Sequence, residues 1–211
     1  SHLDLPVINK TIEQLDTTEL YPFKKIFAAG VGSVMIGHLY IPAIDTSLNR
    51  PTSLSKKNIQ ELLREKLRYN GLTITDGLEM QGVKKFFPNG EASVESIIAG
   101  NDLLCLPDSI PLVVEKIKAA ILSNRIAWND IETHCKKVLY TKYQYVVRNN
   151  DSIAIAGITK DLNQESYGIR KKVAVNAITL LSNKDSIFFP LKQSNVQHKI
   201  AYIGIGINKE N

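Results

Sequence analysis

A carboxylate, Asp76, directly follows the short apolar run 72–75 (Leu-Thr-Ile-Thr), which is typical of a buried strand. Barrel enzymes hold their catalytic groups at the carboxyl ends of parallel strands, where the loops meet. A carboxylate in that place can act as a nucleophile or exchange a proton with a substrate. The alternative is that Asp76 caps a following helix, because aspartate is a common N-cap residue. Residue type and position alone leave both interpretations open.

Two further side chains are candidates for the same site. His38 comes at the end of the apolar run 31–39, and Met80 follows Asp76 by four residues. Either can face the mouth of the site, or else His38 is a hydrogen-bonded core residue and Met80 fills the core. The sequence has no cluster of His, Cys and carboxylate residues at metal-ligand spacing and no GxxxxGK phosphate loop. We therefore predict chemistry that needs no metal and no cofactor.

The elements that must position Asp76 alternate between strand and helix patterns. Short apolar runs predict strands, and apolar residues at helical spacing predict helices between and after them. The first ~18 residues show neither period. Strands are expected at 31–39, 72–75 and 102–106, and helices at 56–69, at 92–99, after Ser109 and around 131–139. This alternation predicts a parallel sheet that is buried on both faces.

Three strands are too few for a closed barrel, which needs about eight. The predicted fold class is therefore α/β, with residues 1–147 forming the C-terminal part (about three β-α units) of a TIM-type (β/α)8 barrel. Polar turn-forming residues predict a linker at 148–165. Residues 166–211 then begin a second α/β sandwich domain that is incomplete. In this second domain we expect a helix at 167–177 and strands at 178–182 and 200–207.

Charge and composition argue against several classes of protein. The net charge of +5 comes from lysine pairs that are scattered beside helices, whereas a nucleic-acid surface needs a continuous basic stripe. No apolar run reaches the ~20 residues that cross a bilayer. The two cysteines, Cys105 and Cys135, are too few for a disulfide framework and are predicted to be small core residues.

The sequence around Asp76, TITDGLEMQGV, resembles the nucleophile motif of glycoside hydrolase family 3, in the form found in bacterial β-N-acetylglucosaminidases. The resemblance covers most of the 211 residues in order and spacing. It implies that Asp76 is the catalytic nucleophile. The other segments that carry it are 37–45 (GHLYIPAID), 50–80, 99–107 (AGNDLLCLP) and 178–191.

The first residues, SHLDLPV, resemble the loop that carries the acid/base dyad of this branch. The resemblance implies that His2 is the general acid/base and that its partner aspartate precedes Ser1. It implies a retaining exo-β-N-acetylhexosaminidase that releases terminal N-acetylglucosamine from a glycan, with peptidoglycan fragments as the expected source. His38 and Met80 are then candidate substrate-binding residues.

The resemblance also leaves alternatives. Family members that are β-glucosidases or xylosidases resemble one another in a Trp directly after the nucleophile, where this chain has Gly77. A non-catalytic sugar-binding relative is a third interpretation. The first half of the barrel is expected upstream of Ser1 as the missing partner of this chain, so we expect the 211 residues alone to be inactive. Localisation stays open between an exported and a cytoplasmic enzyme.

Overall fold

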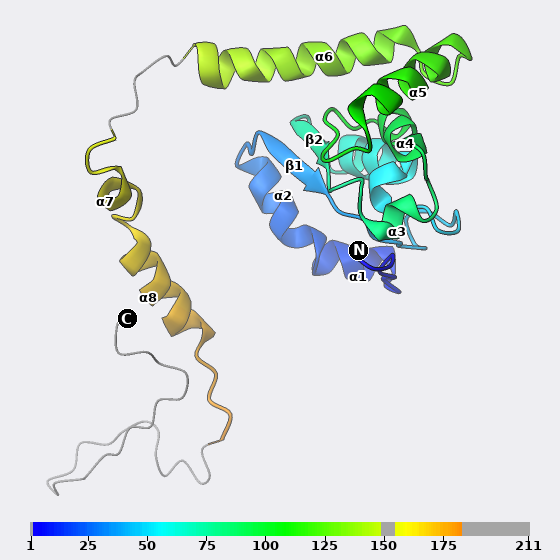
Figure 1. Cartoon of the computed structure of the whole chain (residues 1–211). Helices are drawn as coiled ribbons and strands as arrows, with labels where there is room; N and C mark the ends of the chain where they lie inside the picture. The colour runs from blue at the N-terminus through cyan, green and yellow to red at the C-terminus, as the bar shows by residue number, and fades with distance from the viewer. Residues whose placement is uncertain (1, 149–154, 183–211) are drawn as a thin grey trace, which may run out of the picture. The chain divides into compact units, whose positions relative to one another are not determined.

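The computed structural model describes residues 2–148 and 155–182, and the chain divides into two compact units, Ser1–Asp151 and Ser152–Asn211 (Figure 1). The described part of the first unit is α/β and mostly helical. Its elements are α1 Ile12–Thr17, α2 Leu20–Ala28, β1 Ser33–Ile36, η1 Thr52–Leu54, η2 Lys57–Lys66, β2 Leu72–Thr75, α3 Gln81–Lys84, α4 Glu91–Ala99, α5 Ile110–Leu122, α6 Trp128–Lys142 and η3 Tyr143–Val147.

A parallel pair of strands, β1 and β2, forms the centre of the first unit. Ser33 lies opposite Leu72 and Ile36 opposite Thr75, so the two strands are in register from end to end. Both runs are short and rich in β-branched or apolar residues, which suits a pleated strand. β2 is largely buried, but β1 buries only Ile36 and leaves Met35 exposed, so the prediction of a sheet buried on both faces is wrong for β1. The predicted strands within 31–39 and at 72–75 are therefore confirmed.

The third predicted strand, 102–106, is wrong as a strand. Leu103 forms a single parallel bridge with Ile74, and its carbonyl accepts from the Thr75 N–H at 3.1 Å. The ladder then breaks, because the Cys105 N–H donates to the Thr75 side chain at 2.9 Å rather than to a backbone carbonyl. Leu106 next takes a positive φ of 41°. The segment still runs beside β2, but as an irregular chain.

Two helices precede β1, where the sequence predicted neither a helix nor a strand, and α1 lies within the first ~18 residues that showed no period. A reciprocal pair of hydrogen bonds starts α1: the Gln14 N–H donates to Thr11 Oγ1 at 3.3 Å, and the Thr11 N–H donates to Gln14 Oε1 at 2.9 Å. This capping box satisfies backbone donors that the first helical turn leaves free. The helix α2 follows and lies beside β1 (Figure 1). Its Phe27 ring stacks on Tyr69 at a centroid distance of 4.3 Å.

The predicted helix at 56–69 is confirmed as η2, a wide π-helix that ends at Lys66. It buries Ile59, Leu62 and Leu63 on one face. Leu63 packs with Ile36 of β1, so this helix covers one face of the sheet. Ser55 accepts the Asn58 N–H at 3.2 Å just before the helix.

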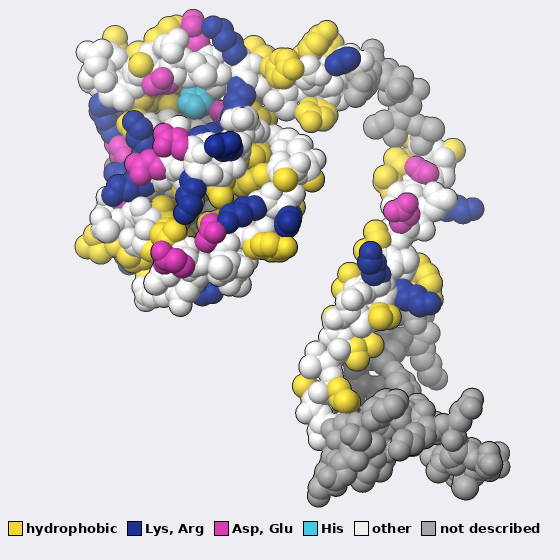
Figure 2. All heavy atoms as spheres, turned by 180° about the vertical axis from the view of Figure 1, so that it is seen from behind, with side chains coloured by type: hydrophobic (Ala, Val, Ile, Leu, Met, Phe, Trp, Pro, Cys, Tyr) yellow, Lys and Arg dark blue, Asp and Glu magenta, His cyan; other side chains and the backbone are white. Residues whose placement is uncertain are grey.

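Helices α4, α5 and α6 pack around a separate apolar cluster. Helix α4 confirms the prediction for 92–99 and ends at Gly100, whose φ of 105° strongly favours glycine. Helices α5 and α6 confirm the predictions after Ser109 and around 131–139. Cys135, predicted to be a core residue, is instead exposed, because α6 buries none of its residues. Positive and negative side chains are interspersed over the face of this unit that Figure 2 shows.

The described part of the second unit holds α7 Ile158–Leu162 and α8 Ser166–Ala177. Helix α8 confirms the predicted helix at 167–177. The strand predicted at 178–182 is wrong: these residues have no regular structure, and Leu181 is exposed, because the described part of this unit offers no strand to pair with. The strand predicted at 200–207 lies outside the described residues. Among the described helices, none is both long and apolar enough to span a bilayer.

Candidate functional site

Asp76 occupies the first position after β2. Its N–H donates to the carbonyl of Ile36 at 3.0 Å, which extends the β1–β2 ladder by one residue. Its side chain is half-buried, and Oδ1 accepts the Gly77 N–H at 2.8 Å. The backbone is therefore fixed by the sheet, and one carboxylate oxygen is oriented by the next amide. This is the position where barrel enzymes present catalytic groups.

His38 lies under the loop that carries Asp76. The side chain is 1 % exposed, and its Nε2 lies 3.0 Å from the Gly77 carbonyl oxygen while Nδ1 lies 2.6 Å from Ser53 Oγ. A carbonyl can only accept, so Nε2 carries the proton and the Ser53 hydroxyl donates to Nδ1. Burial lowers the pKa of His38, against the opposing effects of the Gly77 carbonyl and the Asp76 charge. The imidazole is thus neutral and anchors the Asp76 loop to the strand end at β1.

This geometry bears on the two interpretations of His38. Both ring nitrogens are engaged by protein groups, which favours the hydrogen-bonded core residue over a direct ligand of the substrate. Contact between His38 and a substrate stays a prediction. The structure adds a positioning role that sequence alone does not reveal, because the Gly77 and Ser53 partners are 39 and 15 residues away along the chain.

Met80 lies half-buried at the start of α3, at the end of the turn that follows Asp76. Its N–H donates to the Gly77 carbonyl at 3.1 Å, which closes this turn. A Cβ built at Gly77 would lie 3.6 Å from both Met80 Cε and Leu106 Cδ1. Two apolar side chains therefore lie beside Gly77, Met80 from the same turn and Leu106 from the segment that runs beside β2. The predicted role of Met80 in substrate binding stays a prediction.

His2 is exposed, in an N-terminal segment that is fixed to the same edge of the sheet. Residue Val7 forms a parallel bridge with Tyr40, which lies four residues beyond β1. The Tyr40 N–H donates to the Pro6 carbonyl at 2.8 Å. Asp4, two residues from His2, forms an ion pair with Lys85 at 3.7 Å, just after α3. The segment that carries His2 is thus attached both to the extension of β1 and to the region after Asp76.

Asp102 forms a buried charged network that involves residues near the amino-terminal end of β2. It is 2 % exposed at its side chain and accepts from Lys137 Nζ at 2.8 Å, Arg64 Nη2 at 3.0 Å and the Thr73 N–H at 2.9 Å. Its other oxygen lies 2.8 Å from His134 Nδ1. Burial alone would raise the pKa of Asp102, but these hydrogen bonds outweigh it and hold the pKa well below its usual range. The network ties η2, β2 and α6 together, which supports a structural role.

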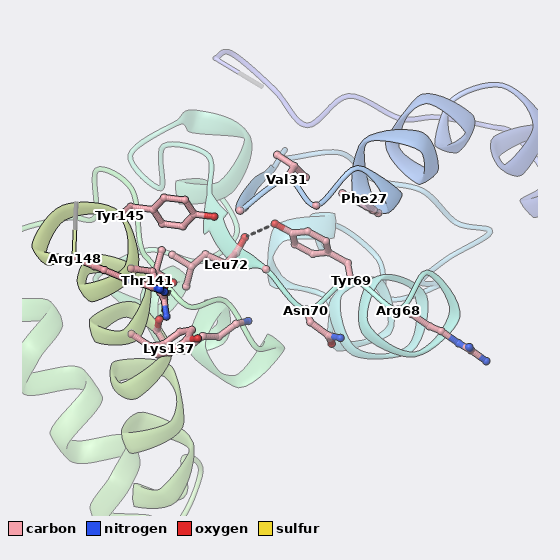
Figure 3. A pocket seen from close by; sticks show the side chains of 15 residues that line it. Phe27, Val31, Arg68, Tyr69, Asn70, Leu72, Lys137, Thr141, Tyr145 and Arg148 are labelled. Carbon is pink, nitrogen blue, oxygen red and sulfur yellow. Dashed lines mark hydrogen bonds between the residues drawn. The ribbon is translucent and has the colours of Figure 1, made fainter. Parts of the chain in front are cut away.

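A cavity of about 780 Å³ also lies at the amino-terminal side of the strands (Figure 3). Residues before β1 and β2, including Gly32 and Tyr69, line one side, and Lys137 and Tyr145 from α6 and η3 line the other. In Figure 3 the Tyr69 hydroxyl donates to the Leu72 carbonyl at 3.3 Å. Barrel enzymes keep their catalytic groups at the opposite, carboxyl end of the strands, so we place the candidate active site at Asp76 instead. Across the described residues, no three His, Cys, Asp or Glu side chains gather as a metal site would require.

Comparison with known proteins gives this geometry a context. Residues 1–141 match the N-terminal domain of glycosyl hydrolase family 3. The chain is 27% identical over 202 residues to β-hexosaminidase A of Pseudoalteromonas piscicida, covering 87% of the chain and 33% of that relative. It is 23% identical to a β-N-acetylglucosaminidase/β-glucosidase of Cellulomonas fimi, covering 95% of the chain and 37% of that protein. The chain therefore spans about a third of the length of these curated relatives.

Solved structures agree with this match. The family 3 β-N-acetylglucosaminidase of Paenibacillus sp. str. FPU-7 superposes with a TM-score of 0.68 at 33% identity, over 74% of this chain and 30% of that one. CbsA of Thermotoga neapolitana superposes with a TM-score of 0.62 at 35% identity, over 67% of this chain and 32% of that one. With the family match over residues 1–141, these findings identify the chain as a member of glycosyl hydrolase family 3 that contains residues of its N-terminal domain.

Proposed function

We propose that the intact protein is a retaining exo-β-N-acetylhexosaminidase in which Asp76 is the nucleophile and His2 the general acid/base. The observation that carries the proposal is the position of Asp76, immediately after β2 and joined to the end of β1 through the Ile36 carbonyl. Family membership supports hydrolysis of a glycosidic bond as the reaction. The relatives named β-hexosaminidase and the β-N-acetylglucosaminidase structures support N-acetylglucosamine as the sugar.

The reaction proceeds in two steps with these residues. A carboxylate oxygen of Asp76 attacks the anomeric carbon while the glycosidic bond breaks, and the His2 imidazolium protonates the departing oxygen. In the second step the neutral His2 takes a proton from water, whose oxygen attacks the same carbon and releases Asp76. An imidazole suits both steps because its unperturbed pKa, ~6.5, lies near neutral pH.

The contacts around the site support this division of roles. Asp76 is held by the sheet and by the loop that His38 anchors, so its carboxylate is fixed where an attack needs orientation. His2 lies on an exposed segment attached to the same edge by the Val7–Tyr40 bridge. The attacking water enters from the side that the leaving group has vacated, so one imidazole at that place can serve in both steps.

In our proposal, the rest of the active site lies in a part of the protein outside these 211 residues. The chain covers about a third of its relatives, and its sheet has two strands in the described residues. A preceding segment would supply the remaining strands and the groups that bind sugar hydroxyls. We therefore expect the 211 residues alone to lack turnover, and peptidoglycan fragments to be the natural substrate of the intact enzyme.

A β-glucosidase is the second candidate, because the Cellulomonas fimi relative is named for both activities. We favour the hexosaminidase because Gly77, rather than the Trp found after the nucleophile in the glucosidase branch, follows Asp76. A sugar-binding protein without catalysis is the third candidate. It is the less favoured, because both Asp76 and His2 are present.

The test is hydrolysis of a chromogenic β-N-acetylglucosaminide by the intact protein and by two variants. Asp76→Asn should lower kcat at least about 10³-fold, because the covalent intermediate can no longer form. His2→Ala should lose activity on substrates with poor leaving groups and retain much of it on a substrate whose leaving group needs no protonation.

Glu79→Gln, at an exposed carboxylate three residues after the nucleophile, is the matched control and should keep its activity. Full activity in Asp76→Asn would refute the assignment of the nucleophile. An intact wild-type protein that hydrolyses none of the β-N-acetylglucosaminide, β-glucoside and β-xyloside substrates would favour the non-catalytic interpretation.

A further inference from the structure

Leu106 combines two features that packing in a core does not explain. It has a positive φ of 41°, in the left-handed region that a residue with a Cβ seldom adopts. The following residue, Pro107, makes this conformation less favourable still, because proline biases the preceding residue toward extended backbone. At the same time the Leu106 side chain is 58 % exposed, so it gains little from burial within the chain.

Hydrogen bonds from the Asp76 strand hold Leu106 in this conformation. The Cys105 N–H donates to Thr75 Oγ1 at 2.9 Å, and the Leu78 N–H donates to the Cys105 carbonyl at 3.0 Å. Leu106 is thereby placed beside Gly77, with its Cδ1 3.6 Å from the point where a Cβ at Gly77 would lie. Strained residues that are held by their surroundings cluster at active sites and ligand contacts.

We propose that Leu106 is a specificity residue that contacts the aglycone, the group that leaves when the glycosidic bond breaks. This inference rests on the proposed function, since it takes Asp76 as the nucleophile. An exo-acting enzyme encloses the terminal sugar and leaves the aglycone toward solvent. Leu106 lies beside Gly77, the residue next to Asp76, and is more than half exposed within the described residues, which places it at the edge of the proposed site. An apolar side chain there favours aglycones that present a hydrocarbon surface.

The experiment compares two substrates of the intact enzyme that share the same sugar. One is 4-nitrophenyl β-N-acetylglucosaminide, whose aromatic aglycone offers an apolar surface. The other is β-N-acetylglucosaminyl fluoride, whose leaving group is a single atom. Leu106→Ala should lower kcat/KM for the nitrophenyl substrate about four- to fifteenfold, equivalent to one or two methyl groups lost from contact. It should leave kcat/KM for the fluoride unchanged.

Three further variants make the result decisive. Leu106→Met keeps an apolar side chain and should retain the wild-type ratio of the two kcat/KM values. Leu106→Asn tolerates the left-handed backbone, so it should show the same selective loss as Leu106→Ala even if the alanine variant folds poorly. Leu122→Ala, at a leucine 85 % exposed at the end of α5, is the matched control and should change neither substrate.

The outcomes separate this inference from the proposed function. Equal losses on both substrates, or no loss on either, would show that Leu106 does not contact the aglycone, while the hexosaminidase activity would stand. A wild-type enzyme that is inactive on both substrates would overturn the proposed function and this inference together.

Discussion

The buried carboxylate of Asp102 offers a stringent test of what holds the sheet and helices together. We predict that Asp102→Asn, which keeps the shape of the side chain and removes its charge, strongly destabilises the protein. In the wild type this carboxylate accepts from Arg64, Lys137 and the Thr73 N–H at 2.8–3.0 Å. An asparagine cannot accept as many hydrogen bonds, and it leaves both cations without a counter-charge.

The structure sets the size of the effect. Breaking a buried ion pair by removing one partner costs about 3–5 kcal/mol. Arg64 and Lys137 keep 16 % and 28 % of their side-chain surface exposed, so water partly compensates each cation. We therefore expect a loss of about 3 kcal/mol in the free energy of unfolding, at the lower end of that range. With a urea m-value near 2 kcal/mol per M, the midpoint should fall by about 1.5 M.

The assay is urea unfolding of the intact protein, followed by circular dichroism, with Glu132→Gln as the control. Glu132 pairs with Lys136 on the exposed surface of the same helix, α6, so its loss should cost less than about 0.5 kcal/mol. An Asp102→Asn variant whose free energy of unfolding lies within about 1 kcal/mol of the wild type would show that the buried network contributes no more than a surface ion pair.

The pH dependence gives a second measure of the same network. The pKa of Asp102 in the folded protein lies below its unfolded value of about 3.9, so the carboxylate stabilises the folded state at pH values above ~4. This contribution is lost as the pH falls through the folded pKa. The difference between the wild type and Asp102→Asn should therefore be present at neutral pH and shrink below about pH 4.

Two other predictions concern the backbone and the buried histidine. Gly71→Ala should lower the free energy of unfolding in urea by about 1–3 kcal/mol, because its Cβ would lie 2.2 Å from Tyr69 Oη and 2.7 Å from the Gly32 carbonyl oxygen. Gly37→Ala is the control, since a Cβ at Gly37 would meet open space. Equal stability of the two variants would contradict this prediction. Burial lowers the pKa of His38 in the folded protein, so below about pH 6.5 the unfolded chain takes up a proton that the folded one does not. The free energy of unfolding should therefore fall with pH below about 6.5, by at most about 1.4 kcal/mol per pH unit. A His38→Gln variant with the same pH dependence would contradict this prediction.

Much of the scaffold around Asp76 could be predicted from local pattern. The strand at 72–75 and the helix ending at Gly100 follow from apolar periodicity and from glycine at a helix end. The helix α1 could have been predicted too, because Thr11 and Gln14 have the spacing of a capping box. The prediction of a third strand was wrong because of a contact between distant residues: the Cys105 N–H donates to the Thr75 side chain and not to a backbone carbonyl.

The contacts that define the site are not visible in local pattern. His38 meets Gly77 across 39 residues, and Asp102 meets Lys137 across 35. An apolar run predicts that His38 lies near the sheet, but only the fold shows which groups its two nitrogens contact. The positive φ of Leu106 likewise depends on hydrogen bonds between Cys105 and the segment around Asp76, so its residue type gives no sign of it.

The most direct test of the central claim is to trap the covalent intermediate. The intact enzyme would be incubated with an N-acetylglucosaminyl fluoride that carries a second ring fluorine, which slows hydrolysis of the glycosyl-enzyme, and then digested and analysed by mass spectrometry. We predict one added sugar on the peptide that contains Asp76 and none in Asp76→Asn. A sugar attached to another residue, or turnover of the fluoride without any labelled peptide, would contradict it.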